Sequence, residues 1–333
     1  MRIAFVGDVM LGRLVDERLR TAAPASVWGD TLPVLARADL RIANLECVLA
    51  RDGAPWPGKA FHFRSAPENV ACLTAAGIDA VSLANNHTLD FGAAALLESV
   101  AVLDGAGIAH AGAGRDDDAA WSPAVVRAGG LDVGLVAFTD NTPDWAAAPQ
   151  SAGVAYAPAD AAHPLGRRLR ELVRATRDAV DVLIVSAHWG GNWGSDVPAA
   201  HRALAHALVE DGADVVFGHS PHIVRGVEVH RGRPILYGAG DFIDDYAVDP
   251  VERNDQSFVF LLELRDGGHL DGGAGRGAPA GLLLWPTLIM DRRASLAGRA
   301  ARPIAARMER LCAELGTRPV WQAAEGCLAL TLG

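Results

Sequence analysis

The stretch VSLANNHTLDFG, residues 81–92, ends a short apolar run with two amides and an imidazole. The run Ala80–Leu83 has the length and composition of a buried strand. Asn85, Asn86 and His87 follow it directly, and buried polar groups of this kind cost free energy unless they are partnered. We therefore expect these three side chains to face a ligand.

Polar side chains follow four other apolar runs in the same way. They are Asp8 after Ile3–Val6, Asn44 and Glu46 after Leu40–Ala43, His188 after Val182–Ser186, and His219 and His222 after Val215–Phe217. Because ligands in open α/β sheets gather at the carboxyl ends of strands, we expect these residues to share one site. Taken singly, Asp8 is also typical of a helix N-cap, Glu46 of an ion pair and His188 of a core histidine.

Amphipathic segments alternate with the apolar runs, a pattern that indicates βα units around a layered sheet. The expected helices are Pro67–Ala76, Gly92–Gly105, Pro164–Ala179 and Pro198–Asp211, with further strands at Val133–Phe138 and Ile235–Tyr237. The pattern then changes. Two strands, Ser257–Leu264 and Leu282–Ile289, are predicted to pair across a Gly-rich loop (residues 267–281), followed by a helix over Pro303–Glu314 and a strand over Cys327–Leu332.

Composition excludes several classes of protein. The chain has 333 residues, half of them hydrophobic, and a formal net charge of −10. Its basic residues are scattered, so we expect no nucleic-acid partner, which would require a basic stripe. The N-terminal apolar run is too short for a signal peptide, and no segment reaches the roughly 20 apolar residues of a membrane span, which predicts a cytoplasmic protein. Four separated cysteines without a CxxC pair argue against a zinc-thiolate site.

The donor types at the strand ends point to a metal. Carboxylate, amide and imidazole donors together suit a divalent cation, and we expect Mn, Zn, Fe, Co or Ca as the cofactor. A carboxylate can bridge two such ions about 3.5–4 Å apart, an arrangement that serves hydrolysis. The strand-end residues are therefore predicted to hold a metal next to the substrate.

Six segments, in order, resemble the CapA family of poly-γ-glutamate capsule-synthesis proteins, relatives of the calcineurin-like metallophosphoesterases. They are GDVMLGR (7–13), NLECVL (44–49), FHFRSAPEN (61–69), SLANNHTLDFG (82–92), AHWGGNW (187–193) and FGHSPHIVRGVEVHRGRPILYGAGDF (217–242). The resemblance implies a four-layered α/β/β/α sandwich of the metallophosphoesterase type with its metal site at strand ends. We expect one domain over residues 1–333, with the core motifs in 1–246 and the sandwich completed by 257–333.

The resemblance also implies the role of each residue. One metal would be held by Glu46, Asn86, His188 and His219, and a second by Asp8, Glu46 and His222, with Glu46 as the bridging ligand. The second site lacks one ligand, because Met10 stands where the family has a histidine and a thioether is a poor donor for such a metal. We therefore expect one tight metal and a second that is weak or absent. Asp8 and His222 are then free to move protons, and His87 lies near the substrate as the third catalytic residue.

Three further residues are predicted to bind substrate. Lys59, the only lysine of the chain, and Arg64 lie in the segment PGKAFHFRSAPEN (57–69), which the resemblance places near the site. Trp189 is expected, with Trp193, to wall the pocket, and core packing is the alternative. Asp241 is interpreted as a supporting or turn residue. The remaining polar residues are interpreted as solvated (Asp244, Asp245) or as surface or core histidines (His62, His163, His201, His206, His230, His269).

The resemblance leaves several activities open. A hydrolase would cleave a peptide, a poly-γ-glutamate chain or a phosphoester, whereas a peptide epimerase of a ribosomal peptide pathway would exchange an α-proton between Asp8 and His222. A non-catalytic capsule biosynthesis protein is the third alternative. We expect a metal-dependent enzyme acting on a peptide or polyglutamyl substrate, because the donor set is too complete for a binding module. A depleted second metal site favours proton transfer over two-metal hydrolysis.

Overall fold

The strand beginning at Arg2 lies at the centre of a ten-stranded mixed sheet in the computed structural model, which describes residues 1–265 and 277–332. The order is β19-β20-β17-β16-β1-β2-β5-β6, with β15 added to β1 and β18 to β17. The strands are β1 (Arg2–Val9), β2 (Leu40–Leu45), β5 (Ala80–Ser82), β6 (Ala109–Ala111), β15 (Asp241–Ile243), β16 (Gln256–Leu264), β17 (Pro279–Ile289), β18 (Ala294–Leu296), β19 (Val320–Gln322) and β20 (Cys327–Thr331). β1, β2 and β5 run parallel, so their carboxyl ends share one edge.

A six-stranded sheet faces the first, in the order β13-β14-β12-β11-β9-β8. Its strands are β8 (Ala124–Ala128), β9 (Leu131–Thr139), β11 (Val182–His188), β12 (Val215–His219), β13 (Val227–His230) and β14 (Arg233–Leu236). β9, β11, β12 and β14 are parallel, and the two edge strands are antiparallel. Two short pairs stand apart, β3 (Val48–Leu49) with β4 (Arg64–Ser65) and β7 (Ala113–Gly114) with β10 (Gly153–Val154).

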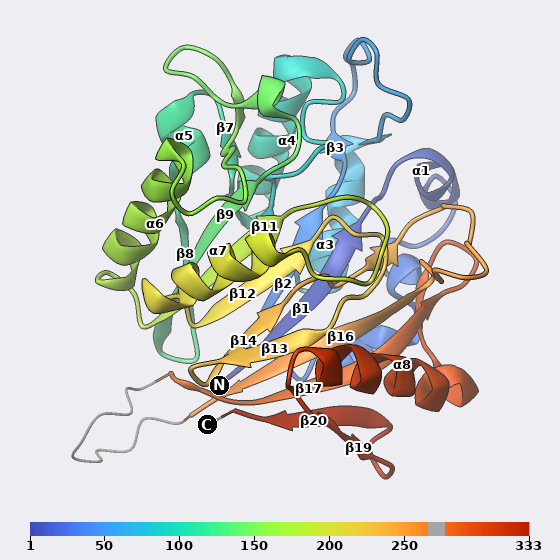
Figure 1. The fold of residues 1–333 in the computed structure, drawn as a ribbon. Helices are drawn as coiled ribbons and strands as arrows, with labels where there is room; N and C mark the ends of the chain where they lie inside the picture. Colours follow the sequence, from blue (N-terminus) through green and yellow to red (C-terminus); the bar gives the residue numbers. More distant parts are fainter. Residues whose placement is uncertain (266–276, 333) are drawn as a thin grey trace.

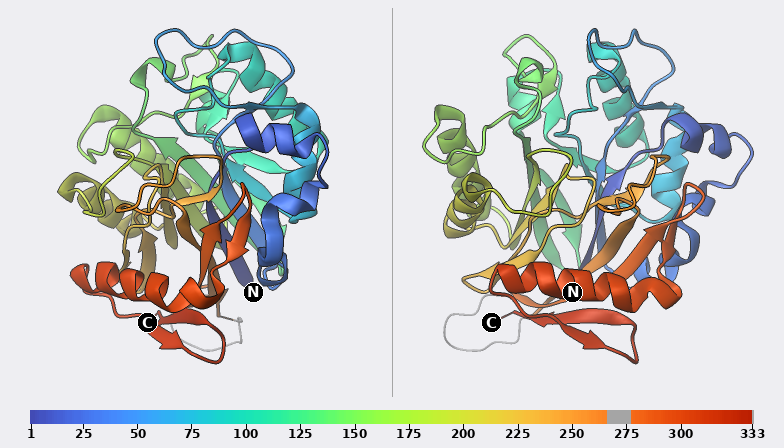
Figure 2. Two further views of the ribbon diagram at one scale, coloured as in Figure 1. Left: turned by 90° about the vertical axis from the view of Figure 1, so that its right-hand side faces the viewer. Right: turned by 45° about the vertical axis from the view of Figure 1, so that its right-hand side comes forward.

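Alternation along each strand divides the core into layers. Ile3 and Phe5 of β1 face the second sheet, where the rings of Phe5 and Phe217 lie 5.2 Å apart. Ala4 and Val6 point the other way, into a separate core. Helices cover both outer faces (Figures 1 and 2): α1 (Arg13–Leu19), α2 (Leu32–Leu35), α3 (Val70–Ala75) and α4 (Gly92–Gly105) on the first sheet, and α5 (Asp117–Trp121), α6 (Pro164–Arg177) and α7 (Ala199–Glu210) on the second. The predicted four-layered α/β/β/α sandwich is confirmed.

The C-terminal segment joins the first sheet at its centre. β16 pairs antiparallel with β1. β16 and β17 pair with each other, as predicted, and they run antiparallel. α8 (Ala301–Glu314) contributes Ile304 and Met308 to the core between the sheets and lies across their lower edge in Figure 2. Most of the predicted Gly-rich loop, residues 267–281, lies outside the described residues.

Other boundaries differ slightly from the prediction. The helix expected over Pro67–Ala76 begins as a 3-10 turn, Pro67–Asn69, before α3. Strands β1, β2, β11 and β12 run two or three residues beyond their apolar cores, because the polar residues that follow each core belong to the strand itself. In the described part of the chain, no helix combines the length and apolar character needed to span a bilayer.

Candidate metal centre

Strand register places the predicted ligands side by side at the carboxyl ends of both sheets. His188 ends β11 and lies opposite His219, which ends β12. On the first sheet, Asp8 lies opposite Asn44 of β2 and opposite Asp241 of β15. Because neighbouring strands are about 5 Å apart, side chains that share a face in register come into contact distance.

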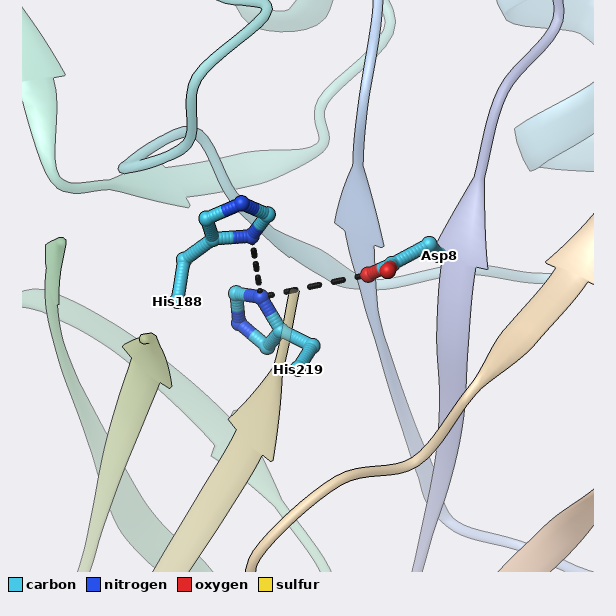
Figure 3. Close-up of side chains that lie close together, drawn as sticks. All are labelled: Asp8, His188 and His219. Atoms are coloured by element: carbon cyan, nitrogen blue, oxygen red, sulfur yellow. Dashed lines mark hydrogen bonds and ion pairs between the residues drawn. The ribbon is translucent and has the colours of Figure 1, made fainter. Parts of the chain in front are cut away.

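The two sheets bring these ends together. Figure 3 shows His188 and His219 of the second sheet beside Asp8 of the first. The Nδ1 atoms of the two histidines are 2.9 Å apart, and Asp8 Oδ1 lies 3.9 Å from His219 Nδ1. The arrangement gathers two imidazoles and a carboxylate from three strands.

Potential ligand atoms form two groups among the described residues, with all atoms of a group within 4.8 Å of one another. One group contains Asp8, His188 and His219, and the other contains Asp8, Glu46, His222 and Asp241. Asp8 is common to both, whereas the resemblance gave the bridging position to Glu46. Asp241 joins the group although it was not predicted as a ligand.

Many polar atoms of these residues are buried without a hydrogen-bond partner. Within residues 1–265 and 277–332 they include Asp8 Oδ2, both carboxylate oxygens of Glu46, Asn86 Oδ1, His188 Nε2 and Asp241 Oδ2. An unpartnered buried acceptor costs about 1–3 kcal/mol, and a charged group costs more. Oxygen and nitrogen donors in this combination match a divalent cation, so the residues fit the predicted metal.

The buried carboxyl groups of the site lie close together, so a cation would stabilise their charged forms. Burial raises the pKa of Glu46 well above its ordinary value, and the neighbouring charges of Asp8 and Asp241 raise it further. Burial raises the pKa of Asp241 as well, with contributions from Asp244 and Asp8. Burial lowers the pKa of His219 to about 3, which keeps its imidazole neutral. Deprotonated carboxylates and neutral imidazoles are the ligand forms, so metal binding would release protons from the carboxyl groups.

A chain of amides fixes the orientation of Asp8. Asn44 Nδ2 donates to Asp8 Oδ1 at 2.8 Å, and Asn85 Nδ2 donates to Asn44 Oδ1 at 3.0 Å. Asn85 also donates to the carbonyl oxygen of Leu45 at 2.8 Å. The two adjacent amides therefore differ: Asn85 supports the carboxylate, whereas Asn86 has the unpartnered oxygen.

His87 lies beside the cluster with one ring nitrogen anchored and the other facing the site. Its Nδ1 is 2.6 Å from Asp90 Oδ2 and 3.2 Å from Lys59 Nζ, while its Nε2 lies 3.8 Å from Glu46 Oε1. Phe63 stacks on the imidazole with 3.9 Å between ring centroids. Burial lowers the pKa of His87 to about 4, so the ring is neutral near pH 7. Its Nε2 is therefore able to exchange a proton with a bound group.

Lys59 is engaged behind His87. It forms an ion pair with Asp90 and a hydrogen bond to the carbonyl oxygen of Asn86, and its Nζ lies 4.7 Å from the ring of Trp145. The side chain is 19% exposed. These contacts orient His87 through Asp90, and the substrate-binding role of Lys59 stays a prediction.

The two tryptophans expected to wall the pocket have different environments. Trp189 is 0% exposed, stacks on His201 and Tyr237, and donates from its indole N–H to the Tyr237 carbonyl at 3.0 Å. Its substrate-binding role is thus corrected to core packing, the alternative left open above. Trp193 is 48% exposed with its ring 6.1 Å from that of His222, so it lies at the mouth of the site.

The segment GAGDFIDDY (residues 238–246) holds the residues that sequence reasoning missed. Asp241 Oδ1 lies 2.9 Å from His222 Nδ1, and Asp241 is in register with Asp8. The prediction that Asp244 and Asp245 are solvated is wrong: Asp244 is 3% exposed and the Asp245 side chain is fully buried. The strand-end pattern gave no signal for Asp241, because Asp241 begins β15 and does not follow an apolar run.

Met10 occupies the place of the missing histidine without presenting its sulfur as a ligand. It is 1% exposed, and its Sδ accepts a hydrogen bond from the backbone N–H of Gly12 at 3.1 Å. Asp241 instead adds a carboxylate to the second group. The second metal position was expected to be weak because only three ligands were predicted for it. The structure adds Asp241 as a fourth potential ligand.

Two other predicted residues lie outside both ligand groups. Arg64, the third residue expected to bind substrate, is on β4 and lines a cavity of about 500 Å³ together with His62. His201 is buried, as the surface-or-core interpretation allowed, and lies 3.0 Å from Asp140. His269 lies outside the described residues.

Two stacked sheets flanked by helices, with carboxylates and imidazoles gathered at one end, define a four-layered α/β protein with a candidate metal centre. The family described as "Bacterial capsule synthesis protein PGA_cap" matches residues 2–246. The chain belongs to this family, which confirms the CapA resemblance of its six motifs.

Relatives with similar sequences agree with this assignment. A "probable polyglutamine synthesis accessory protein" of Mycobacterium tuberculosis is 38% identical over 278 residues, covering 72% of this chain and 73% of that protein. The "PGA biosynthesis protein CapA" of Bacillus subtilis is 26% identical over 245 residues, covering 73% of this chain and 63% of that protein. The solved structure of the calcineurin-like phosphoesterase YfkN from Bacillus subtilis aligns with 89% of this chain and 88% of its own chain, at 12% identity and a TM-score of 0.40.

Proposed function

We propose that this chain is a metal-dependent hydrolase that cleaves an amide bond in a peptide or poly-γ-glutamate-type substrate. The observation that carries the proposal is the set of buried, unpartnered ligand atoms at the strand ends. Such atoms reduce stability in a protein that binds no cation, and sites of this kind are retained where function requires them. Two relatives are named for polyglutamine synthesis and for PGA biosynthesis, and these names motivate the choice of a polymer of this kind as the substrate.

The two ligand groups suggest two metal positions. His188, His219 and Asn86, with Asp8 or Glu46, would hold one ion, and the oxygen-rich group Asp8, Glu46, Asp241 and His222 would hold another. When bound, the metal supplies Lewis-acid polarisation of the substrate carbonyl and a more acidic water molecule. Borderline cations such as Zn or Mn suit the first position, and harder cations such as Mn or Ca suit the second.

His87 is the proposed proton-transfer residue. Asp90 accepts from the Nδ1 side of the ring, which leaves the Nε2 lone pair directed at the cluster. A neutral imidazole in that position takes a proton from the attacking group and returns it to the departing amine. Lys59 stabilises the Asp90 carboxylate and thereby the orientation of His87.

The geometry favours hydrolysis over α-proton exchange between Asp8 and His222. Inversion at a carbon requires an acid and a base on opposite faces, and a reach of about 3 Å for each separates them by roughly 6 Å. The ligand atoms of Asp8 and His222 belong to one group within 4.8 Å, and His222 is already bonded to Asp241. Both residues are better placed as metal ligands than as opposed bases.

Incubation with γ-linked oligoglutamate in ¹⁸O-labelled or deuterated water, followed by mass spectrometry, tests the proposal. We expect fragments that carry one solvent oxygen, formed only by metal-loaded protein. We also expect Asp8→Ala and His222→Ala to lose metal as well as activity. Uptake of a deuteron without cleavage, or cleavage of a phosphodiester in place of the amide, would contradict the proposal.

A further inference from the structure

A second concentration of charge lies outside the metal centre, in the cavity of about 500 Å³ between α1, β4 and the start of α4. Its lining includes four arginines and two carboxylates: Arg13, Arg20, Arg51, Arg64, Asp16 and Glu17. An excess of positive charge is notable in a chain whose net charge is −10. The volume is within the range of pockets that bind small ligands, about 300–1,000 Å³.

The acidic side of this cavity is largely committed to local structure. Asp16 Oδ1 accepts from the backbone N–H of Ala66 and from Asn69 Nδ2, both at 2.9 Å. Only a long contact of 3.4 Å joins Asp16 to Arg20, whose side chain is 71% exposed. Asp16 therefore holds the loop after β4 and neutralises the arginines only in part.

Arg64 is the cation of the cavity without an acidic partner. In the part of the chain that the structure describes, no carboxylate pairs with it, whereas Arg51 pairs with Glu68. Its guanidinium lies 4.6 Å from the ring centroid of Phe91. Stacking on an aromatic ring leaves the in-plane N–H donors free, and their fork matches the two oxygens of a carboxylate.

Arg13 lies between the cavity and the metal centre, and its Nε pairs with Asp245 Oδ2 at 3.3 Å. Its guanidinium lies 5.7 Å from the ring of Phe63 and 6.0 Å from that of Tyr246. Phe63 stacks on His87, and the Tyr246 ring lies 5.1 Å from that of His222. A single layer of aromatic rings therefore separates the basic cavity from residues of the proposed catalytic site.

We propose that this basic cavity is a subsite that binds a carboxylate of an acidic peptide chain, with Arg64 as the principal contact. Arg13, which Asp245 partly neutralises, lies on the side of the subsite toward the metal centre. The identity of the substrate rests on the proposed function. Binding in the cavity does not require metal, because its charge is supplied entirely by side chains. A subsite remote from the reacting bond contributes binding energy and orientation.

The experiment measures fluorescence anisotropy of a labelled γ-linked oligoglutamate with metal-depleted full-length protein. We expect Arg64→Gln to weaken binding roughly tenfold or more, which is the effect of one lost charge-assisted hydrogen-bonded pair. Arg64→Lys should restore only part of the affinity, because an ammonium cannot form the planar fork. Arg127→Gln is the matched control, since Arg127 lies on β8 and pairs with Asp132. Arg20→Gln, at an exposed position, provides a second cavity variant that leaves folding intact.

Several results would overturn the subsite. These are equal binding of oligoglutamate by wild type and Arg64→Gln, equal binding of labelled oligoglutamine, or binding of inorganic phosphate without binding of oligoglutamate. Failure of the proposed function looks different: metal-depleted protein would still bind oligoglutamate through Arg64, but metal-loaded protein would not cleave it. Cleavage together with Arg64-independent binding would remove the subsite and leave the hydrolase.

Discussion

Among the residues that the structure describes, buried polar groups have partners at one end of the second sheet and lack them at the other. At the amino end of β12, the carboxylate of Asp214 accepts from the backbone N–H of Leu183 at 2.9 Å and pairs with Arg177 and Arg233. At the carboxyl ends of the same strands, His188 keeps an unpartnered nitrogen, and the carboxylates that face it from the first sheet keep unpartnered oxygens. One end is neutralised by the protein's own arginines. The other end would be neutralised by the proposed metal.

We infer from this difference that the partnered buried charges stabilise the fold and that the unpartnered ones belong to the functional site. Partnered carboxylates join neighbouring elements, whereas unpartnered ones weaken the fold unless a ligand satisfies them. The comparison predicts that substitutions at the two ends have opposite consequences for stability and metal binding.

The largest effect is expected at the unpartnered end. His219→Ala should weaken metal binding at least about 100-fold, because loss of groups that merely support ligands already costs about 10–100-fold. Elemental analysis and calorimetric titration of the purified variant would measure this loss, with His206→Ala as the control because His206 stacks on His230 near the surface. Full metal content in His219→Ala would contradict the role of His219 as a metal ligand.

His87 differs from the other residues at the carboxyl ends of the strands, because Asp90 partners its Nδ1. His87→Gln should lower the rate of cleavage by about 10²–10⁴-fold, the usual contribution of a general acid or base. Metal content should stay unchanged, because His87 belongs to neither ligand group. A variant that loses its metal, or one that retains full activity, would assign His87 a different role.

At the amino end of β12, substitution should reduce stability and leave metal binding unchanged. Asp214→Ala should lower the free energy of unfolding by about 1–3 kcal/mol, a range reduced by the partial solvent exposure of Arg177 and Arg233. Metal affinity should be unaffected. Urea unfolding with the exposed Asp178→Ala as the control would measure the difference, and an unchanged unfolding midpoint for Asp214→Ala would contradict its structural role.

The smallest effect is a gain in stability. Asp241→Asn should stabilise metal-depleted protein by about 1 kcal/mol at neutral pH, because it removes a charge whose burial raises the pKa of Asp241 well above 3.8. A carboxyl with a raised folded-state pKa loses its stabilising contribution as pH rises above the unfolded value. The gain from Asp241→Asn should therefore be small near pH 4 and grow toward neutral pH. Thermal unfolding in chelator at several pH values tests this, and a destabilised variant at pH 7 would refute it.

Sequence reasoning located the central strands and most of the cluster because each ligand followed an apolar run. Asp8, Glu46, Asn86, His188, His219 and His222 all follow that rule. The same reasoning failed for Asp241, which begins a three-residue strand that only tertiary pairing with β1 defines. It could not predict the full burial of Trp189 or the ion pair of Lys59, because exposure and ion pairing depend on which layer covers a residue. Neither the partners of Arg64 nor the basic cavity could be predicted from local pattern, since the lining comes from four separate segments.

The most direct test of the metal centre is anomalous X-ray scattering from crystals grown with Mn²⁺ or Zn²⁺. We expect a strong anomalous peak at coordination distance, about 2.0–2.3 Å, from His188 and from the carboxylate of Asp8 or Glu46. A second, weaker peak is expected beside Asp241 and His222. A fully occupied site elsewhere in the molecule, with no anomalous density between the two sheets at their carboxyl ends, would contradict it.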